Sequence, residues 1–365
     1  MKKKILIVVG TRPNFIKVTQ FKKEAAHFPG IEIRIVHTGQ HFDAQMADVF
    51  FEQFALQPDY FLNISQGSAN QQMSQIMTRL EELIAATFKP DLVMVVGDVN
   101  STFAAALTAK KLNIRIAHLE SGLRSFDKSM PEEDNRVLTD AITDLFFVTE
   151  QSGIDNLLNE KVPAEKIFFV GNTMIDTLVA YKEKIMASDI LEKLKIVKGN
   201  YVLMTMHRPA TVDDRAGLLE LIGLIEDVTS SEKLVFPVHP RTLKNITAQG
   251  LISHFERNKN LVTTPPLDYF AFQKLAASCH YILTDSGGIQ EESTHLGVPC
   301  LTLRPNTERP VTCSIGTNTL VPFDRAVIGK NIADIKSGRY KKGVNPPLWD
   351  GRSTFRILEI INSLP

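Results

Sequence analysis

The sequence has few cysteines and no excess of either charge. Its three cysteines, Cys279, Cys300 and Cys313, are widely spaced and lie in or beside apolar segments, which predicts buried thiols rather than a disulfide framework or a zinc site. Lysine plus arginine number 41, as do aspartate plus glutamate, so the chain lacks the basic surplus typical of proteins that bind nucleic acid or membrane surfaces. Any cations that bind an anionic ligand must therefore be gathered locally.

Long apolar runs and several familiar motifs are also missing. No run approaches the length of a transmembrane span, and the apolar run at residues 5–9 is too short for a signal peptide and is soon followed by Arg12. The sequence contains no G-x-G-x-x-G dinucleotide fingerprint, no G-x-S-x-G elbow and no D-x-D element for a metal. These absences predict a cytoplasmic protein that uses neither a metal nor another cofactor.

Short apolar strands alternate with segments of helical period along the 365 residues, and polar loops follow the strands. In the N-terminal half the predicted strands are residues 5–9, 32–37, 92–96, 114–117, 145–148 and 167–170. In the C-terminal half they are residues 201–205, 234–237, 260–262, 281–283 and 299–303. This alternation is typical of doubly wound α/β folds, in which the loops at the carboxyl ends of the strands form the site.

The pattern restarts halfway along the chain, which predicts two Rossmann-like doubly wound lobes facing each other across a cleft. We expect the N-terminal lobe to comprise residues 1–172 and the C-terminal lobe residues 173–351. A helix from about Thr173 to Ala187 should carry the chain across, and the apolar positions of residues 352–365 predict one further helix.

One stretch, residues 282–301, is predicted to form a strand, a tight turn, a helix and a second strand. Gly287 and Gly288 allow a ligand to approach the backbone closely, because they have no Cβ atoms. Together with Ser286 they fall at the predicted helix N-terminus and at the carboxyl end of a strand. Free N–H groups and the helix dipole favour a phosphate at such a place.

Two acids, Glu291 and Glu292, lie one turn into the same predicted helix. A carboxylate there suits a pair of sugar hydroxyls such as a ribose diol. The alternative is an ordinary capped helix, with Asp285 or Ser286 as the N-cap and the two glutamates as favourable first-turn acids. The sequence alone leaves both interpretations open.

Two cations, Arg12 and Lys17, stand near the start of a helix that Pro13 opens after the first strand. Cations at a helix N-terminus oppose the helix dipole, so helix stability alone does not explain them, whereas a bound anion does. The alternative is that both side chains point into solvent.

Polar side chains also follow other predicted strands. Asp98 and Glu120 end neighbouring strands of the N-terminal half and Glu132 begins the helix after the next loop, so the carboxylates should converge, as general acid and base catalysis needs. The position of Asp98 is equally consistent with a helix N-cap, and that of Glu132 and Glu133 with a first-turn dipole pair. In the C-terminal half, His207 ends the first strand and would face the cleft.

These stretches, taken together and in order, resemble the non-hydrolysing UDP-N-acetylglucosamine 2-epimerases along nearly the whole chain. The matching motifs are Gly10-Thr-Arg-Pro with Lys17, Gly97-Asp98, His118-Leu-Glu-Ser-Gly-Leu-Arg124, Pro131-Glu-Glu with Asn135-Arg136, His207-Arg208, Asp285-Ser-Gly-Gly-Ile-Gln-Glu-Glu292 and Glu308-Arg-Pro310. The resemblance implies the two-lobed fold of the GT-B glycosyltransferases, with the last helix packing back on the N-terminal lobe.

The resemblance also implies three groups of site residues. The chemistry would be carried by Asp98, Glu120, Glu132 and His207. UDP would be bound by Arg12, Lys17, Arg136, Phe272, Ser286, Gly287, Gly288, Glu292 and Arg309. A second, activating UDP-sugar site would involve Gln40, His41, Met46 and His239, although His239 on its position alone reads as structural or regulatory. Residues 209–214 depart from the family pattern beside that site, so activation stays an open question.

The implied activity is the reversible 2-epimerisation of UDP-N-acetylglucosamine to UDP-N-acetylmannosamine, by elimination of UDP to a 2-acetamidoglucal and re-addition, for surface polysaccharide precursors. The expected partner is a UDP-sugar, with no nucleic acid and no membrane, and we expect a homodimer. Four alternatives stay open: an epimerase of a related UDP-2-acetamido sugar, a hydrolysing epimerase, a GT-B glycosyltransferase, and a nucleotide-sugar sensor without turnover.

Overall fold

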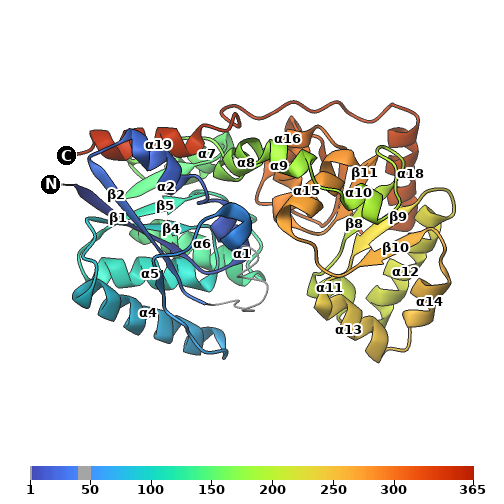
Figure 1. Cartoon of the computed structure of the whole chain (residues 1–365), viewed down its shortest axis with the longest axis horizontal. Coiled ribbons are helices and arrows are strands. Elements are labelled where there is room, and N and C mark those ends of the chain that lie inside the picture. Colours follow the sequence, from blue (N-terminus) through green and yellow to red (C-terminus); the bar gives the residue numbers. More distant parts are fainter. Residues whose placement is uncertain (1, 40–50) are drawn as a thin grey trace. The chain divides into compact units, whose positions relative to one another are not determined.

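The computed structural model describes residues 2–39 and 51–365, which form two compact units (Figure 1). The first unit comprises Met1–Ala180 and Pro347–Pro365, and the second comprises Tyr181–Pro346. The chain therefore enters the second unit after residue 180 rather than at the predicted position 172, and it returns at residue 347 rather than 352.

The first unit is built on a seven-stranded parallel sheet with the order β3-β2-β1-β4-β5-β6-β7. Its strands are β1 (Lys3–Val9), β2 (Ile31–His37), β3 (Tyr60–Phe61), β4 (Leu92–Val96), β5 (Arg115–Leu119), β6 (Leu145–Val148) and β7 (Ile167–Phe169). The two-residue edge strand β3 escaped prediction because it is too short to show a period. The strand order reverses between β1 and β4, where doubly wound sheets form their sites.

Helices cover both faces of this sheet. Figure 1 shows α4 and α5 on one face, with α2 and α19 on the other. The helices of the first unit are α1 (Arg12–Ile16), α2 (Phe21–Glu24), α4 (Ala69–Ala86), α5 (Asn100–Lys111), α6 (Pro131–Ile142), α7 (Gln151–Asn159), α8 (Thr173–Ala180) and α19 (Ser353–Ser363). Leu6 and Val8 of β1 belong to one buried cluster with residues of α4 and α5. Alternate residues of this buried strand therefore pack against the helices on opposite faces of the sheet.

The crossing helix predicted at residues 173–187 is divided into α8 and α9 (Lys182–Met186). The Asp176 carboxylate on α8 accepts hydrogen bonds from the backbone N–H groups of Ser353 and Thr354, at 3.0 and 2.6 Å, where α19 begins. Thr177 donates to the carbonyl oxygen of Ile16 at 2.6 Å. These bonds keep α8 in the first unit, which explains the shifted boundary.

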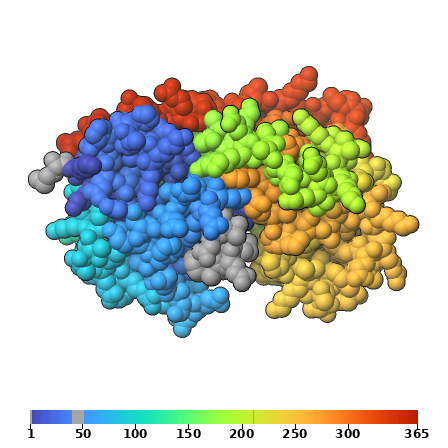
Figure 2. Space-filling view, viewed as in Figure 1, coloured from blue at the N-terminus to red at the C-terminus, as the bar shows by residue number. Residues whose placement is uncertain are grey.

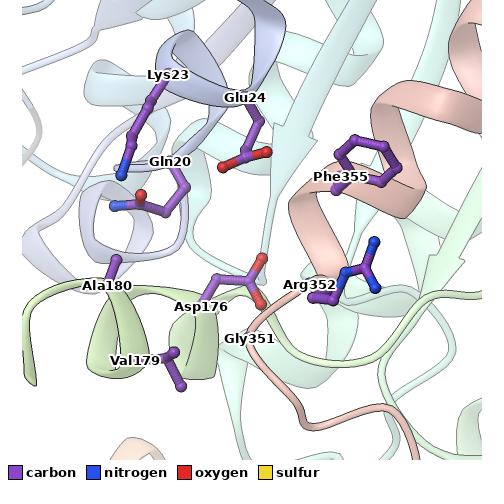
Figure 3. A pocket seen from close by; sticks show the side chains of 9 residues that line it. All are labelled: Gln20, Lys23, Glu24, Asp176, Val179, Ala180, Gly351, Arg352 and Phe355. Carbon is purple, nitrogen blue, oxygen red and sulfur yellow. The ribbon is translucent and has the colours of Figure 1, made fainter. Parts of the chain in front are cut away.

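The C-terminal helix packs on the first unit, as predicted. Figure 3 shows the Asp176 side chain beside Arg352 and Phe355 in a pocket that Gln20 and Glu24 also line. In the space-filling view the C-terminal segment, in red, lies against the blue N-terminal part of the first unit (Figure 2).

The second unit repeats the plan with a six-stranded parallel sheet of order β10-β9-β8-β11-β12-β13. Its strands are β8 (Val202–Thr205), β9 (Leu234–Pro237), β10 (Leu261–Thr264), β11 (Tyr281–Thr284), β12 (Cys300–Leu303) and β13 (Asn318–Val321). Five of them were predicted. The edge strand β13 was missed, because its apolar run is only two residues long.

The second unit contains ten α-helices among the described residues. They are α9, α10 (Ile190–Lys193), α11 (Pro209–Val212), α12 (Arg215–Thr229), α13 (Pro240–Ala248), α14 (Ile252–Arg257), α15 (Tyr269–Ser278), α16 (Gly287–Leu296), α17 (Pro310–Ser314) and α18 (Arg325–Lys336). The predicted doubly wound α/β class is thus confirmed for both units.

The cysteines are free thiols, and Cys279 and Cys300 are buried as predicted, while Cys313 is only partly buried. Burial raises the pKa of the Cys300 thiol to about 11. Within the described part of the chain, no helix is both long and apolar enough to cross a membrane.

Gly122 illustrates how closely the loop after β5 packs. Its φ is +78°, and a Cβ atom there would lie 2.3 Å from the carbonyl oxygen of Gly153 on α7. We expect Gly122→Ala to lower the free energy of unfolding by roughly 2–5 kcal/mol, because the left-handed backbone and the clash both oppose a methyl group. Gly250→Ala is the matched control. The φ of Gly250 is +68°, and among the described residues no atom lies within 4 Å of the position that a Cβ would take, so only the backbone cost of about 1–2 kcal/mol applies. Thermal unfolding of both variants tests this, and equal losses would contradict the packing argument.

Candidate functional site

A buried ion pair marks the carboxyl edge of the first sheet. Lys17 Nζ lies 2.5 Å from Glu120 Oε2, and both side chains are at most 5% exposed. Glu120 follows β5 with φ at +71°, a left-handed conformation that is unfavourable for a glutamate and that clusters at functional sites. Asn14 fixes the turn that carries Lys17, because its Nδ2 donates to the carbonyl oxygen of Val96 at 3.1 Å, and so joins α1 to the end of β4.

Asp98, after β4, is held by a second buried cation. Nε and Nη2 of Arg136 donate to Asp98 Oδ2 at 3.0 and 2.7 Å, and the amide of Asn135 donates to the Asp98 carbonyl oxygen at 2.9 Å. Asp98 is not the N-cap of α5, because Val99 occupies that position without any side-chain cap. The helix N-cap alternative for Asp98 is therefore excluded. The Asp98 carboxylate remains partly exposed.

The two glutamates at the start of α6 differ sharply. Glu133 is buried and accepts hydrogen bonds from Ser125 N, Ser125 Oγ and Phe126 N at 2.8–2.9 Å, so it anchors the preceding loop. Burial alone would raise the pKa of Glu133, but these bonds and the charge of Arg136 hold it below its usual range. Glu132 is exposed. Glu133 is thus a loop anchor rather than half of a dipole pair, and Glu132 is the acid accessible for chemistry.

A charged network that the sequence did not reveal lies beneath the Gly97-Asp98 turn. His118 Nδ1 is 2.6 Å from Asp140 Oδ1, and its Nε2 is 2.8 Å from the Gly97 carbonyl oxygen. Asp140 also pairs with Arg124 at 2.8 Å. Burial would raise the pKa of Asp140, but His118 and Arg124 outweigh it and lower it. His118 and Arg124 belong to a recognisable motif, whereas nothing in the sequence around Asp140 signals its role.

In the second unit, Ser286 is the N-cap of α16, and Gly287 and Gly288 begin the helix directly after β11. The Ser286 side chain makes no capping hydrogen bond, and Asp285 does not cap the helix either. Ser286 thus occupies the predicted N-cap position, but neither its side chain nor that of Asp285 accepts a hydrogen bond from the first-turn N–H groups of α16.

Asp285 instead holds His207. Its Oδ2 accepts hydrogen bonds from the backbone N–H groups of His207 and Arg208 at 2.9 and 2.8 Å, and its Oδ1 lies 2.9 Å from His207 Nδ1. Burial would raise the pKa of Asp285, but the His207 contacts and both N–H groups keep it below its ordinary value. With Nδ1 engaged, Nε2 is the ring nitrogen available for chemistry.

His239 lies at a helix N-terminus. It is the N-cap of α13, where its Nδ1 accepts from the backbone N–H of Arg241 at 3.2 Å. Its ring centroid lies 5.9 Å from that of His207. Burial lowers the pKa of His239, and the nearby His207 and Arg241 lower it further.

Arg309 lies beside the first turn of α16. Its Nε is 2.8 Å from Glu291 Oε2, and it also pairs with Glu308. A Cβ atom on Gly287 would lie 3.1 Å from Arg309 Nη1, so the structure brings the glycine turn and this cation together. Glu291 is fully buried and orients Arg309 rather than serving as an exposed first-turn acid.

Other predicted residues have less defined surroundings. Glu292 is 6% exposed on α16, and Arg12 is the partly exposed first residue of α1. Phe272 on α15 packs against the core between α15 and α16, as helical spacing suggests. Gln40, His41 and Met46 lie outside the described residues. The described residues contain no cluster of three or more histidine, cysteine or acidic side chains able to hold a metal ion.

Two doubly wound units, with ionisable side chains at the carboxyl edges of their sheets and a glycine turn beside an arginine, define a two-lobed Rossmann-like protein. The profile of the UDP-N-acetylglucosamine 2-epimerase family matches residues 23–362. The chain belongs to this family.

Three similar proteins show the range of the family. A UDP-N-acetylglucosamine 2-epimerase homolog of Methanococcus maripaludis is 41% identical and is aligned over 99% of this chain and 100% of its own length. A UDP-2,3-diacetamido-2,3-dideoxy-D-glucuronate 2-epimerase of Pseudomonas aeruginosa is 37% identical, over 99% and 100% respectively. The crystal structure of the Methanocaldococcus jannaschii UDP-GlcNAc 2-epimerase in complex with UDP-GlcNAc and UDP superimposes with a TM-score of 0.89 at 37% identity, over 98% and 99% of the two chains.

Proposed function

We propose that the protein interconverts UDP-N-acetylglucosamine and UDP-N-acetylmannosamine without net hydrolysis. The observation that carries the proposal is the set of anchored ionisable groups. Asp98 and Glu120 are each paired with a buried cation, and His207 is oriented by a buried carboxylate. Groups fixed in this way suit proton transfer at defined positions of a bound sugar.

The reaction needs such groups because the C2 proton of the sugar is not acidic. In the proposed route a base removes the C2 proton while the C1–oxygen bond breaks, and its electron pair leaves with UDP to give a 2-acetamidoglucal. UDP then attacks C1 again, while an acid protonates C2 from the opposite face. Two acid/base groups are required, which argues for an epimerase over a glycosyltransferase that needs a single base.

The proposed roles divide between the units. Asp98, Glu120, Glu132 and His207 serve the chemistry, while the turn Ser286-Gly287-Gly288, with Arg309 and Arg12, binds the diphosphate. Glu292 would bind the ribose, and Phe272 the uracil. Lys17 and Arg136 are assigned to hold Glu120 and Asp98, since both are already paired with those acids. We further propose that the protein is a homodimer and that its product is a precursor of surface polysaccharides.

A second candidate is the same reaction on a related UDP-2-acetamido sugar. The Pseudomonas aeruginosa 2-epimerase of a diacetamido uronate is as similar in sequence, at 37% identity, as the Methanocaldococcus jannaschii UDP-GlcNAc 2-epimerase. Residues 209–214 depart from the family pattern, and the first four of them form α11 (Pro209–Val212), which follows His207 and Arg208 directly. Incubation with each sugar separates the two candidates.

Epimerisation in deuterated water tests the proposed route. We expect UDP-N-acetylmannosamine with deuterium at C2, because a solvent proton replaces the one removed, and ¹⁸O in the bridging position should scramble into the non-bridging positions of the same phosphate. NMR of the products reads both. Protium retained at C2 would rule out elimination, and accumulation of UDP with free N-acetylmannosamine would show a hydrolysing enzyme.

A further inference from the structure

Arg304 is a buried cation that neither the sequence motifs nor the proposed roles include. It lies directly after β12, and its side chain is nearly inaccessible to solvent. Nη2 donates to Glu308 Oε2 at 3.0 Å, whereas Nε and Nη1 have no hydrogen-bond partner among the described residues. Buried donors without acceptors are costly, and a guanidinium is costlier than a neutral group. An acceptor bound to these two donors would therefore be stabilising.

The unpartnered Nη1 faces the glycine turn. A Cβ atom on Gly287 would lie 3.8 Å from Arg304 Nη1, beside the Nη1 of Arg309. Arg304 and Arg309 therefore both lie beside the first turn of α16, a ten-residue helix whose N-terminal N–H groups and dipole also favour an anion.

The local charges leave Arg304 less neutralised than Arg309. Arg309 pairs with both Glu291 and Glu308, whereas the described residues give Arg304 one acidic partner, Glu308. Burial lowers the pKa of the Arg304 guanidinium, Glu308 raises it, and the charges of Arg208 and Arg309 lower it, so the net shift is downward. An added negative charge between these arginines would relieve their mutual repulsion.

We propose that Nε and Nη1 of Arg304 bind the diphosphate at the first turn of α16, and that they bind free UDP more tightly than the UDP-sugar. This inference rests on the proposed function. When the C1–oxygen bond breaks, its electron pair stays on the diphosphate, which gains one negative charge. A desolvated guanidinium with open donors interacts more strongly with that state, so Arg304 stabilises the leaving group and not merely the bound substrate.

The competing explanation is that Arg304 only holds Glu308 and the loop before α17. Two substitutions separate the explanations. Arg304→Met removes the charge and every donor. Arg304→Lys keeps a cation for Glu308 but loses the planar fork that binds two phosphate oxygens together. Arg339→Met is the matched control, because Arg339 is an exposed arginine of the same unit that pairs with Asp334.

The experiment measures UDP, pyrophosphate and UDP-N-acetylglucosamine affinities by calorimetry, alongside kcat, KM and thermal stability. We expect Arg304→Met and Arg304→Lys to weaken UDP and pyrophosphate binding by about tenfold to a hundredfold, which is the range for hydrogen bonds to a charged group. The UDP-sugar should lose less affinity, and kcat should fall more than KM rises. Arg304→Lys should unfold near the wild-type temperature, and Arg339→Met should bind and turn over as the wild type does.

Other outcomes would overturn the proposal. Unchanged UDP affinity in a folded Arg304→Lys would show that the side chain does not contact the diphosphate. Equal losses for UDP and UDP-sugar would remove the leaving-group role. Calorimetry measures binding without turnover, so the two proposals can fail separately. If the wild type failed to epimerise but the Arg304 variants still weakened UDP binding, the proposed function would be refuted and the Arg304 site supported. A wild-type protein that binds neither UDP nor pyrophosphate would refute both.

Discussion

Asp98→Asn is expected to lower kcat by about a hundredfold to ten-thousandfold, the usual contribution of a general acid or base, while UDP affinity stays near that of the wild type. Asparagine keeps the shape of the side chain, and its carbonyl oxygen can still accept from Arg136, which stays paired with Glu133 as well. The substitution therefore removes proton-transfer capacity with little effect on the fold. Steady-state kinetics and UDP calorimetry of the same preparation measure the two quantities.

Asp134→Asn supplies the control, because Asp134 is an exposed acid on the same helix as Arg136 and has no predicted role. Its kcat should equal that of the wild type. If Asp98→Asn retained full activity, Asp98 would be a structural partner of Arg136 and nothing more. A release of free 2-acetamidoglucal by Asp98→Asn would place its role in re-addition rather than elimination.

The architecture was predictable because its signals are local. Most strands of the two sheets contain a run of apolar residues bounded by polar loops, and the glycine turn at Gly287 follows its strand. The pattern of strand, loop and helix therefore placed Asp98, Glu120 and Ser286 at sheet edges before any contact was known. Where the local signal is weak, as in β13, the prediction failed.

The pairings inside the site were not predictable, because they join residues far apart in the sequence. Lys17 and Glu120 are 103 residues apart, and Asp285 and His207 are 78 apart. An aspartate before a serine and two glycines reads as a helix cap from sequence, and only the tertiary contact with His207 shows otherwise. The role of Glu133 as a loop anchor was not predictable for the same reason, because its partners Ser125 and Phe126 lie in a loop without a periodic pattern.

The His207–Asp285 contact leads to the second large effect. Asp285→Asn is expected to lower kcat by about tenfold to a hundredfold, the range for a group that orients a functional side chain, with a much smaller change in KM. The amide lacks the negative charge, and it can accept from His207 Nδ1 only by giving up the oxygen that now accepts from two backbone N–H groups. Asp285 is a positioning residue in this account, so its effect should pass through His207.

A double-mutant comparison tests that dependence. If Asp285 acts through His207, then Asp285→Asn combined with His207→Ala should be no slower than His207→Ala alone, because the group being positioned is already gone. Additive losses would mean that Asp285 acts on Ser286 and the α16 turn instead. Asp268→Asn is the stability control, since Asp268 is a helix N-cap in the same unit, with the Ala271 N–H as donor.

The pKa of Asp285 adds a pH signature to the same variant. Because the folded-state pKa is depressed, the carboxylate contributes stability above its unfolded pKa of about 4, and this contribution is lost as the pH falls through the lower folded-state pKa. Asp285→Asn should therefore melt well below the wild type at pH 7, and the gap should narrow as the pH falls below about 4. Thermal unfolding across this range measures the gap. A gap that stayed constant with pH would show that the carboxylate charge contributes nothing to stability, and that the histidine is held by shape alone.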